Sequence, residues 1–356
     1  MKTVSVLSEE SYTQWDVFVE RHPMGSIYHL SGWKKALEES FKHIRGELVV
    51  IWDEAKANIV AGLPVYHVNS RISGKRLVSA PFANFCEPLI ADPEASGRLN
   101  DYLIRRYQRD NSGCIEVKAR ARSESLVDAK FGIATERNWH HFLPLDSPPE
   151  LLLKKFHKKS VRVPISKAEK HGLQLRIGTS ENHLSLFYEI YANSRKRIGL
   201  PSLPYRFFEM LWGVFRPSDR IQLIMCMHQD TAIGASLLLK FKDWVFIEYG
   251  HDVFEFRRMN VNHFLDWEAI KLAHREGFKY LSFGRTSDHN PGLMAYKSHW
   301  ATSAETFVTH FYPEAFSAVE GEKETSWKYH LARRICKKSP HALYRILSAT
   351  IYHHMK

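Results

Sequence analysis

A polar loop that follows a short apolar run holds the residues best suited to chemistry. The run Tyr280–Phe283 is typical of a buried strand, and the loop after it carries Arg285, Ser287, Asp288 and His289. Because α/β folds bind ligands at the carboxyl ends of strands, these side chains are candidates for contacting a substrate. Asp288 or His289 could accept a proton from an attacking amine as a general base. A hydrogen-bonded turn without a chemical role is the alternative.

The elements around this loop predict a compact α/β unit. Two apolar runs, Ile233–Lys240 and Trp244–Gly250, are joined by two polar residues and predict a β-hairpin. After a basic loop, apolar residues recur at helical spacing from Val261 to Ala273 and predict an amphipathic helix. Gly277 is expected to end that helix in the C′ position. Hairpin, helix and returning strand would together position the polar loop.

This order of elements resembles the core of the GNAT acyltransferase fold. The segment that closes it is more specific, because Phe283-Gly-Arg-Thr-Ser is followed by Gly292-Leu-x-x-Tyr-Lys-x-x-Trp300. This pattern resembles the FemAB-like aminoacyltransferases of peptidoglycan interpeptide bridges, and among them the proteins associated with exosortase/PEP-CTERM exopolysaccharide systems. The resemblance extends over residues 27–316 and is densest over residues 193–300.

The resemblance assigns roles to three further residues. FemAB-like enzymes place the lysine of this motif near the donor carbonyl or a substrate phosphate, which implies that Lys297 is catalytic and that Tyr296 contacts the substrate. An ammonium there would stabilise the negative charge that develops on the tetrahedral intermediate of acyl transfer. In the same family the R-x-x-x-G-x-P turn, here Arg195 to Pro201, borders the acceptor groove. For Lys297 the alternative is a surface lysine near the start of a strand.

The loop before the predicted helix bears on the acyl donor. In acetyl-CoA-dependent GNAT enzymes it has the pattern Q/R-x-x-G-x-G/A, whose glycines let backbone amides approach the pyrophosphate. Here it is Arg257-Arg-Met-Asn-Val-Asn262, with asparagine at both glycine positions. Asparagine side chains crowd that approach, which argues against an ordinary CoA donor. Arg257, Arg258 and Asn262 remain candidate substrate-binding residues, with solvated loop arginines as the alternative. We expect no bound cofactor and leave aminoacyl-tRNA and acyl-CoA open as donors.

The first half of the chain repeats this order of elements. Val60–Val65 corresponds to Ala232–Leu237, and Cys114–Val117 corresponds to Tyr280–Phe283. A repeat of about 170 residues indicates two copies of one domain, with convergent α/β regularity as the alternative. We expect two tandem GNAT-like domains, each a mixed sheet flanked by helices, at residues 1–147 and 151–316, and no coiled-coil arm. A basic amphipathic helical tail is expected at residues 322–356.

Composition limits the class of protein and its partners. The chain has 356 residues, is 44% apolar, and contains no apolar run long enough to span a bilayer. Acidic residues at positions 9 and 10 interrupt any signal-peptide core, so a cytoplasmic location is expected. The four cysteines are scattered, which argues against a structural zinc site and a disulfide framework. A net charge of +11 predicts an anionic partner, such as a nucleotide-sugar, a lipid-linked precursor or tRNA.

Two basic segments are candidates for such contacts. The run Lys154–Arg162 could contact phosphates, and a solvated helical face is the alternative. The segment Trp327–Lys356 combines basic residues with apolar residues at helical spacing. It could lie on the inner face of the membrane, where it would suit a lipid-linked acceptor, or dock against the preceding domain.

These observations predict an acyltransferase that moves an aminoacyl or acyl group to an amine of a cell-envelope precursor, either a peptidoglycan peptide or an exopolysaccharide sugar. Direct attack without a covalent enzyme intermediate is expected, because no activated serine or cysteine stands out. Two rivals remain: an N-acyltransferase that uses acyl-CoA or an acyl-carrier protein, and a catalytically silent module that binds glycan or RNA.

Overall fold

The computed structural model describes residues 2–55, 57–70, 74–120, 134–313 and 327–353. The chain forms two compact units, residues 1–137, 306–331 and 350–356 in the first and residues 138–305 and 332–349 in the second. The domain limits predicted from the sequence repeat, at residues 147 and 151, stay a prediction. Those at 316 and 322 lie outside the described residues.

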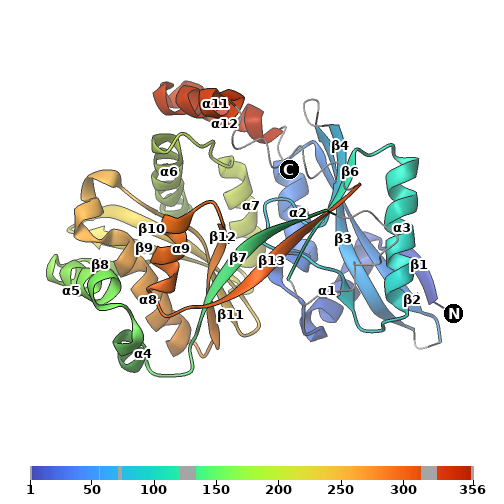
Figure 1. Ribbon diagram of the computed structural model, residues 1–356, viewed down its shortest axis with the longest axis horizontal. Coiled ribbons are helices and arrows are strands. Elements are labelled where there is room, and N and C mark those ends of the chain that lie inside the picture. Colours follow the sequence, from blue (N-terminus) through green and yellow to red (C-terminus); the bar gives the residue numbers. More distant parts are fainter. Residues whose placement is uncertain (1, 56, 71–73, 121–133, 314–326, 354–356) are drawn as a thin grey trace. The chain divides into compact units, whose positions relative to one another are not determined.

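The first unit is built on a mixed sheet with the strand order β1-β2-β3-β4-β6-β13 (Figure 1). β4 and β6 are parallel and are connected through α3, whereas the other neighbours in this order are antiparallel. The short strand β5 pairs with β3. The elements are β1 (Lys2–Val6), η1 (Glu9–Ser11), α1 (Tyr12–Arg21), η2 (Ile27–His29), α2 (Ser31–Ser40), β2 (Ile44–Asp53), β3 (Asn58–Ser70), β4 (Gly74–Val78), β5 (Leu89–Ile90), α3 (Ala95–Arg109), β6 (Cys114–Arg120) and most of β13 (Ser303–Tyr312).

The second unit has a mixed sheet with the strand order β8-β9-β10-β11-β12-β7. β11 and β12 are its parallel pair, connected through α8, and the other neighbours in this order are antiparallel. The elements are β7 (Ala134–Pro144), α4 (Pro149–Lys155), η4 (Lys158–Arg162), α5 (Val163–Lys170), β8 (Gln174–Gly178), α6 (Glu181–Arg197), α7 (Tyr205–Phe215), β9 (Ile221–His228), β10 (Thr231–Phe241), β11 (Trp244–Asp252), η5 (Phe254–Met259), α8 (Val261–Arg275), β12 (Tyr280–Ser287) and α9 (Pro291–Ser298). Two helices near the C-terminus are α11 (Trp327–Lys338) and α12 (His341–His353).

The two units share one topology, and the predicted α/β fold with mixed sheets flanked by helices is confirmed. In each, three antiparallel pairings lead to one parallel pair that spans a helix, so β3 corresponds to β10 and β6 to β12, as the sequence repeat predicts. The final strand is exchanged between the copies. Residues 138–144 of β7 pair with β12 in the second unit, and Phe307–Tyr312 of β13 pair with β6 in the first.

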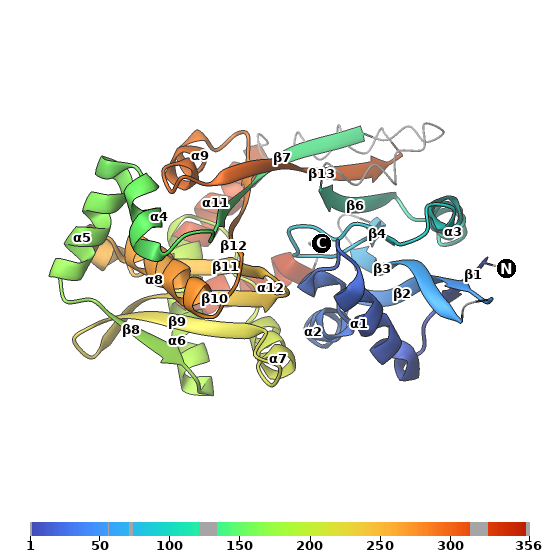
Figure 2. The ribbon, with the colours of Figure 1, turned by 90° about the horizontal axis from the view of Figure 1, so that it is seen from below.

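The core of the second unit lies between its sheet and α8. Val261, Phe264, Leu265, Ala269 and further residues of the predicted stripe are buried against the sheet. Helices α5 and α8 cover one face of the sheet, and α6 and α7 cover the other (Figures 1 and 2). The predicted hairpin is confirmed: β10 and β11 pair across Lys242-Asp243, and Lys242 takes a positive φ of 51°. This packing fixes β12 beside α8 and thereby the loop that leads to α9.

Candidate functional site

Lys297 is the most deeply buried of the predicted site residues. It lies near the end of α9, a helix that begins at Pro291 after the Asn290 side chain accepts a hydrogen bond from Leu293 N at 3.1 Å. The residue is 5% exposed, and Nζ donates to the carbonyl oxygens of Gly284 at 3.0 Å and Arg285 at 3.1 Å. The alternative of a surface lysine near a strand start is therefore wrong. The catalytic role of Lys297 stays a prediction.

The surroundings of Lys297 lower its pKa. Burial is the main cause and brings the pKa to about 8, against the opposing charges of Asp266 and Glu248. An ammonium has three N–H donors, and the two backbone carbonyls occupy two of them. Among the described residues the third makes no hydrogen bond. The Lys297 amine is thus largely protonated and positively charged at neutral pH, and it loses its proton at a pH just above neutral.

Asp266 and Tyr296 form a short hydrogen bond beside this lysine. The Tyr296 hydroxyl donates to Asp266 Oδ2 at 2.5 Å and so connects α9 to α8. Loss of water around Asp266 raises its pKa to about 7, although the Tyr296 hydrogen bond and the Lys297 charge act in the other direction. Burial and the neighbouring carboxylate raise the pKa of Tyr296 well above 10. Asp266 is thus a carboxyl group that changes charge near neutral pH.

Aromatic rings line the same region. The His263 and Trp300 rings stack at 5.9 Å with an interplanar angle of 25°, and the Tyr296 ring meets His263 edge-on at 5.3 Å. His263 Nε2 donates to the Ser160 carbonyl at 2.9 Å. Burial lowers the pKa of His263, and this hydrogen bond only partly offsets the effect. The imidazole is therefore neutral at physiological pH and acts as an apolar wall with one fixed donor.

A second neutral imidazole, His141 on β7, lies near Lys297. Its Nδ1 is 3.1 Å from Thr302 Oγ1, and its Nε2 is 3.4 Å from Met294 Sδ. Burial, together with the charges of Lys297 and His140, lowers its pKa to about 4. Because it stays uncharged, His141 adds no positive charge that would compete with the ammonium.

The predicted general base lies in a turn at the surface. Asp288 is exposed and accepts a hydrogen bond from Trp139 Nε1. Ser287 Oγ accepts from the His289 amide at 3.3 Å, and the Arg285 side chain is exposed while its carbonyl accepts from Lys297. These residues form the hydrogen-bonded turn that the sequence left open as an alternative. Their roles in catalysis or binding stay predictions.

The predicted loop arginines lie on η5. Arg257 and Arg258 are exposed, and the Arg257 guanidinium lies 4.1 Å from the centre of the Phe254 ring. Asn260 adopts the left-handed conformation, with φ 60°, at the N-cap position of α8, where its side chain makes no capping hydrogen bond. Asn262 is exposed in the first turn of α8. The asparagine at the first glycine position therefore keeps the backbone conformation that glycine favours and adds a side chain.

Arg195 stands on α6, where its Nε donates to the Pro201 carbonyl at 3.0 Å across the predicted turn. Gly199 in that turn has a φ of +78°, a conformation that glycine adopts without strain. The hydrogen bonds of Lys297 in the described part of the chain reach neither this turn nor the η5 arginines.

Sequence reasoning missed Asp266, His263 and His141. A signal existed for Asp266, because helical spacing places it beside Ala269 and Ala273 at the edge of the buried stripe. An acid at that edge is unusual. The pairing with Tyr296 depends on how α9 packs against α8, which no spacing in the sequence specifies.

The described residues include neither a cluster of metal-ligating side chains nor a helix that could span a membrane. No group of three His, Cys, Asp or Glu side chains there could hold a metal ion. No helix among them is long and apolar enough to cross a bilayer.

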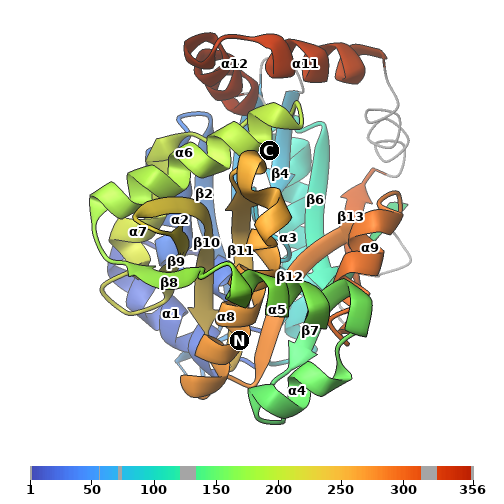
Figure 3. The same ribbon diagram turned by 90° about the vertical axis from the view of Figure 1, so that its left-hand side faces the viewer.

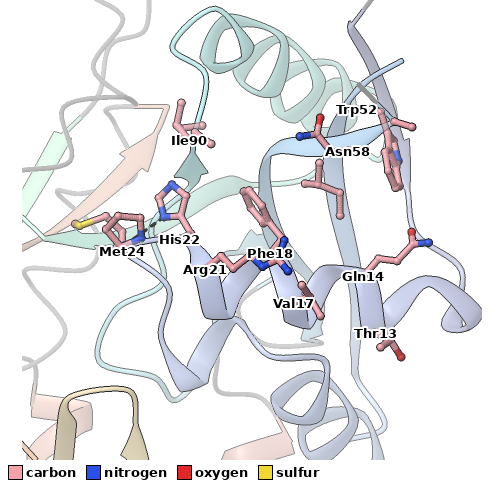
Figure 4. A pocket seen from close by; sticks show the side chains of 14 residues that line it. Thr13, Gln14, Val17, Phe18, Arg21, His22, Met24, Trp52, Asn58 and Ile90 are labelled. Carbon is pink, nitrogen blue, oxygen red and sulfur yellow. Dashed lines mark hydrogen bonds between the residues drawn. The ribbon is translucent and has the colours of Figure 1, made fainter. Parts of the chain in front are cut away.

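A separate pocket of about 880 Å³ lies in the first unit (Figure 4). One side is formed by α1, with Val17, Phe18 and Arg21, and the other by residues that include Trp52 and Ile90. None of the predicted site residues lines this pocket.

Comparisons with known proteins agree with this architecture. Residues 155–298 match the family model described as an acetyltransferase (GNAT) domain. The structure is similar to that of FemX, with a TM-score of 0.66 and 14% identity over 86% of this chain and 96% of that chain. It is also similar to a tandem GNAT protein from the clavulanic acid biosynthesis pathway, with a TM-score of 0.56 and 11% identity over 87% of this chain and 98% of that chain.

A third similar structure is the C-terminal domain of a putative lysylphosphatidylglycerol synthetase from Agrobacterium fabrum, with a TM-score of 0.57 and 10% identity over 89% of this chain and 95% of that chain. No functionally curated protein matches. Residues 155–298 of the second unit thus match a GNAT acetyltransferase domain, and the fold of the chain is similar to those of FemX and of a tandem GNAT protein.

Proposed function

We propose that this protein is an acyltransferase that moves an aminoacyl group to an amine of a cell-envelope precursor, with Lys297 stabilising the transition state. The observation that carries the proposal is the burial of a lysine with a pKa of about 8 on a GNAT-type scaffold. Burying an ammonium is costly, and perturbed lysines of this kind concentrate at functional sites. The resemblance of the surrounding motif to FemAB-like aminoacyltransferases supports the same role.

The proposed reaction needs no covalent enzyme intermediate. The acceptor amine attacks the ester carbonyl of the donor, a C–N bond forms, and the carbonyl oxygen becomes an oxyanion. The free N–H of Lys297 donates to that oxygen, and its positive charge stabilises the oxyanion. As the C–O bond of the ester breaks, the proton lost by the amine passes to the leaving alkoxide. Asp266 helps to keep Lys297 protonated, because its negative charge raises the lysine pKa.

Aminoacyl-tRNA is the donor that the loop before α8 supports best. A GNAT pyrophosphate site needs open backbone amides, but Asn260 and Asn262 place side chains where CoA enzymes have glycines. For the acceptor, we propose a peptidoglycan peptide or an exopolysaccharide amino sugar like those of the exosortase-associated systems. The exposed Arg257 and Arg258 would contact the phosphates of donor or acceptor.

The test is a reconstituted transfer assay with aminoacyl-tRNA and amine-bearing precursors, and mass spectrometry as the readout. Lys297→Ala should lower the rate about 100-fold or more, as removal of an oxyanion donor does in other acyl-transfer enzymes. Lys279→Ala is the matched control, since that side chain is 67% exposed and pairs with Asp243 at the surface. Equal rates for the two variants would remove Lys297 from the mechanism.

Two further measurements separate the rivals. Micromolar binding of acetyl-CoA that is lost in Arg257→Ala would assign a CoA donor and contradict the aminoacyl proposal. Binding of glycan or RNA without turnover for any donor would identify a binding module. Comparing envelope precursors from cells with and without the protein would identify the acceptor.

A further inference from the structure

The two C-terminal helices expose apolar side chains that a docked helix would normally bury. Ile335 on α11 is 47% exposed, and on α12 Leu343 is 47% and Ile346 65% exposed. Most large aliphatic side chains of the second unit are instead buried in its core. With Leu331 of α11, which is also 47% exposed, the two consecutive helices expose four large aliphatic side chains, and such exposure is typical of an interaction surface.

The same helices carry a one-sided charge. From Trp327 to Lys356 the sequence contains no Asp or Glu. Arg334, Lys337 and Lys338 are exposed and adjoin Ile335 on α11. We call Ile335, Leu343 and Ile346, together with Arg334, Lys337 and Lys338, the tail patch. The tail patch thus combines aliphatic and basic side chains, and residues 327–356 contain no acidic residue that could pair with the basic ones.

The opposite face of these helices is already used. The Tyr344 hydroxyl donates to the Leu200 carbonyl at 2.8 Å, and the Ser202 amide donates to Ser348 Oγ at 3.2 Å. Arg333 Nη2 donates to the Ile198 carbonyl at 2.9 Å. The helices therefore dock beside the C-terminal end of α6 (Figure 3) through Arg333, Tyr344 and Ser348.

We propose that the tail patch is a peripheral binding surface for an anionic phospholipid membrane. Exposed aliphatics beside lysines and arginines match the headgroup region of such a bilayer, where apolar side chains enter the acyl boundary and cations meet lipid phosphates. The lack of acidic residues removes the repulsion that such a surface would otherwise meet. An RNA partner would use the charges but leave the aliphatic residues exposed, and an apolar protein partner would leave the charges unmatched.

Three aliphatic side chains alone give weak binding, so the attraction depends on lipid charge. The protein should bind vesicles of phosphatidylcholine mixed with phosphatidylglycerol, and not vesicles of phosphatidylcholine alone. Added salt should weaken this binding. Each basic residue at an anionic surface contributes about fivefold to the partition coefficient, and each inserted aliphatic side chain contributes about tenfold.

The test is vesicle co-sedimentation of the full chain. Replacing Arg334, Lys337 and Lys338 together by Gln should lower partitioning about 100-fold. The matched control replaces Lys35, Lys42 and Arg45 by Gln, which removes three exposed charges outside both basic segments. For the apolar part, Ile346→Gln should lower partitioning, while Leu151→Gln, at a side chain 48% exposed on α4, should not.

Three results would overturn the proposal. The first is absence of binding to anionic vesicles, and the second is an equal loss in the two triple variants, which would mean that net charge alone drives binding. The third is a dimer in solution that dissociates on Leu343→Gln, which would assign the patch to a second copy of the chain. Because vesicle binding needs no turnover, its failure would leave the proposed acyl transfer untouched, and the reverse also holds.

Discussion

The burial of Lys297 has a cost that can be measured without knowing any substrate. Its pKa of about 8 is about 2.5 below the ordinary value of 10.5, which corresponds to about 3 kcal/mol lost when the charged lysine enters the folded state. The side chain is only 5% exposed, so solvent screening does not remove this cost. A fold that tolerates such a cost retains the lysine for another reason.

Lys297→Met removes the charge and keeps a flexible apolar side chain of similar length. The Gly284 carbonyl then loses its hydrogen-bond donor, which lowers the free energy of unfolding by about 1–2 kcal/mol. The Arg285 carbonyl also loses its donor, but Arg285 is exposed and water can replace it. The net effect expected at pH 7 is a gain of about 1–2 kcal/mol in the free energy of unfolding, together with loss of activity. Stability gained where function is lost is the signature of a functional site.

The pH dependence isolates the contribution of the charge. Between pH 8 and pH 10.5 the unfolded lysine still holds a proton that the folded one has lost, so the stability of the wild type rises through this window. The Met variant lacks this rise, and its advantage should shrink by about 3 kcal/mol. Urea denaturation followed by tryptophan fluorescence gives the difference, with Lys279→Met as the exposed control. A difference that stays constant from pH 7 to 10.5 would refute the assignment of a buried ammonium.

Two further substitutions test the contacts around the site and the tail. Tyr296→Phe leaves the Asp266 carboxyl without its donor and should cost about 1–3 kcal/mol in urea denaturation at pH 8, with a smaller loss at pH 5, where the carboxyl is protonated; an equal loss at both would contradict the short hydrogen bond. Gly199→Ala places a Cβ 2.7 Å from the Arg333 carbonyl at a φ of +78°, so it should destabilise the chain more than Gly172→Ala, where the added Cβ meets nothing within 4 Å at +67°. Thermal unfolding compares the two, and equal shifts would mean that α11 does not dock at Gly199.

The periodic parts of the fold could be predicted from the sequence. The apolar stripe predicts a helix over residues 260–276, and α8 spans Val261–Arg275. The polar stretch after Phe283 was expected to be a loop, yet β12 continues to Ser287. Its ladder with residues 138–140 of β7 uses backbone groups, which the side-chain pattern does not reveal. Likewise, the helix α9 begins at Pro291-Gly292, a dipeptide typical of turns, because Asn290 caps it.

The site was only partly predictable for a related reason. The Tyr-Lys motif identified Lys297, but its burial depends on the carbonyls of Gly284 and Arg285. Asp266 enters the site because α8 and α9 pack together, although the two residues of its hydrogen bond lie 30 positions apart in the chain. Contacts between elements of this kind are set by three-dimensional packing, whereas spacing reports only on single elements.

The exchange of final strands has a consequence for how the chain is made and cut. During synthesis, β6 emerges about 190 residues before Phe307–Tyr312, the residues with which it pairs. One edge of β6 therefore stays unpaired until most of the polypeptide has been made. A fragment that stops at residue 147 would expose that edge, and one that starts at 151 would leave β12 without residues 138–144. Neither fragment would therefore contain the complete sheet of its unit.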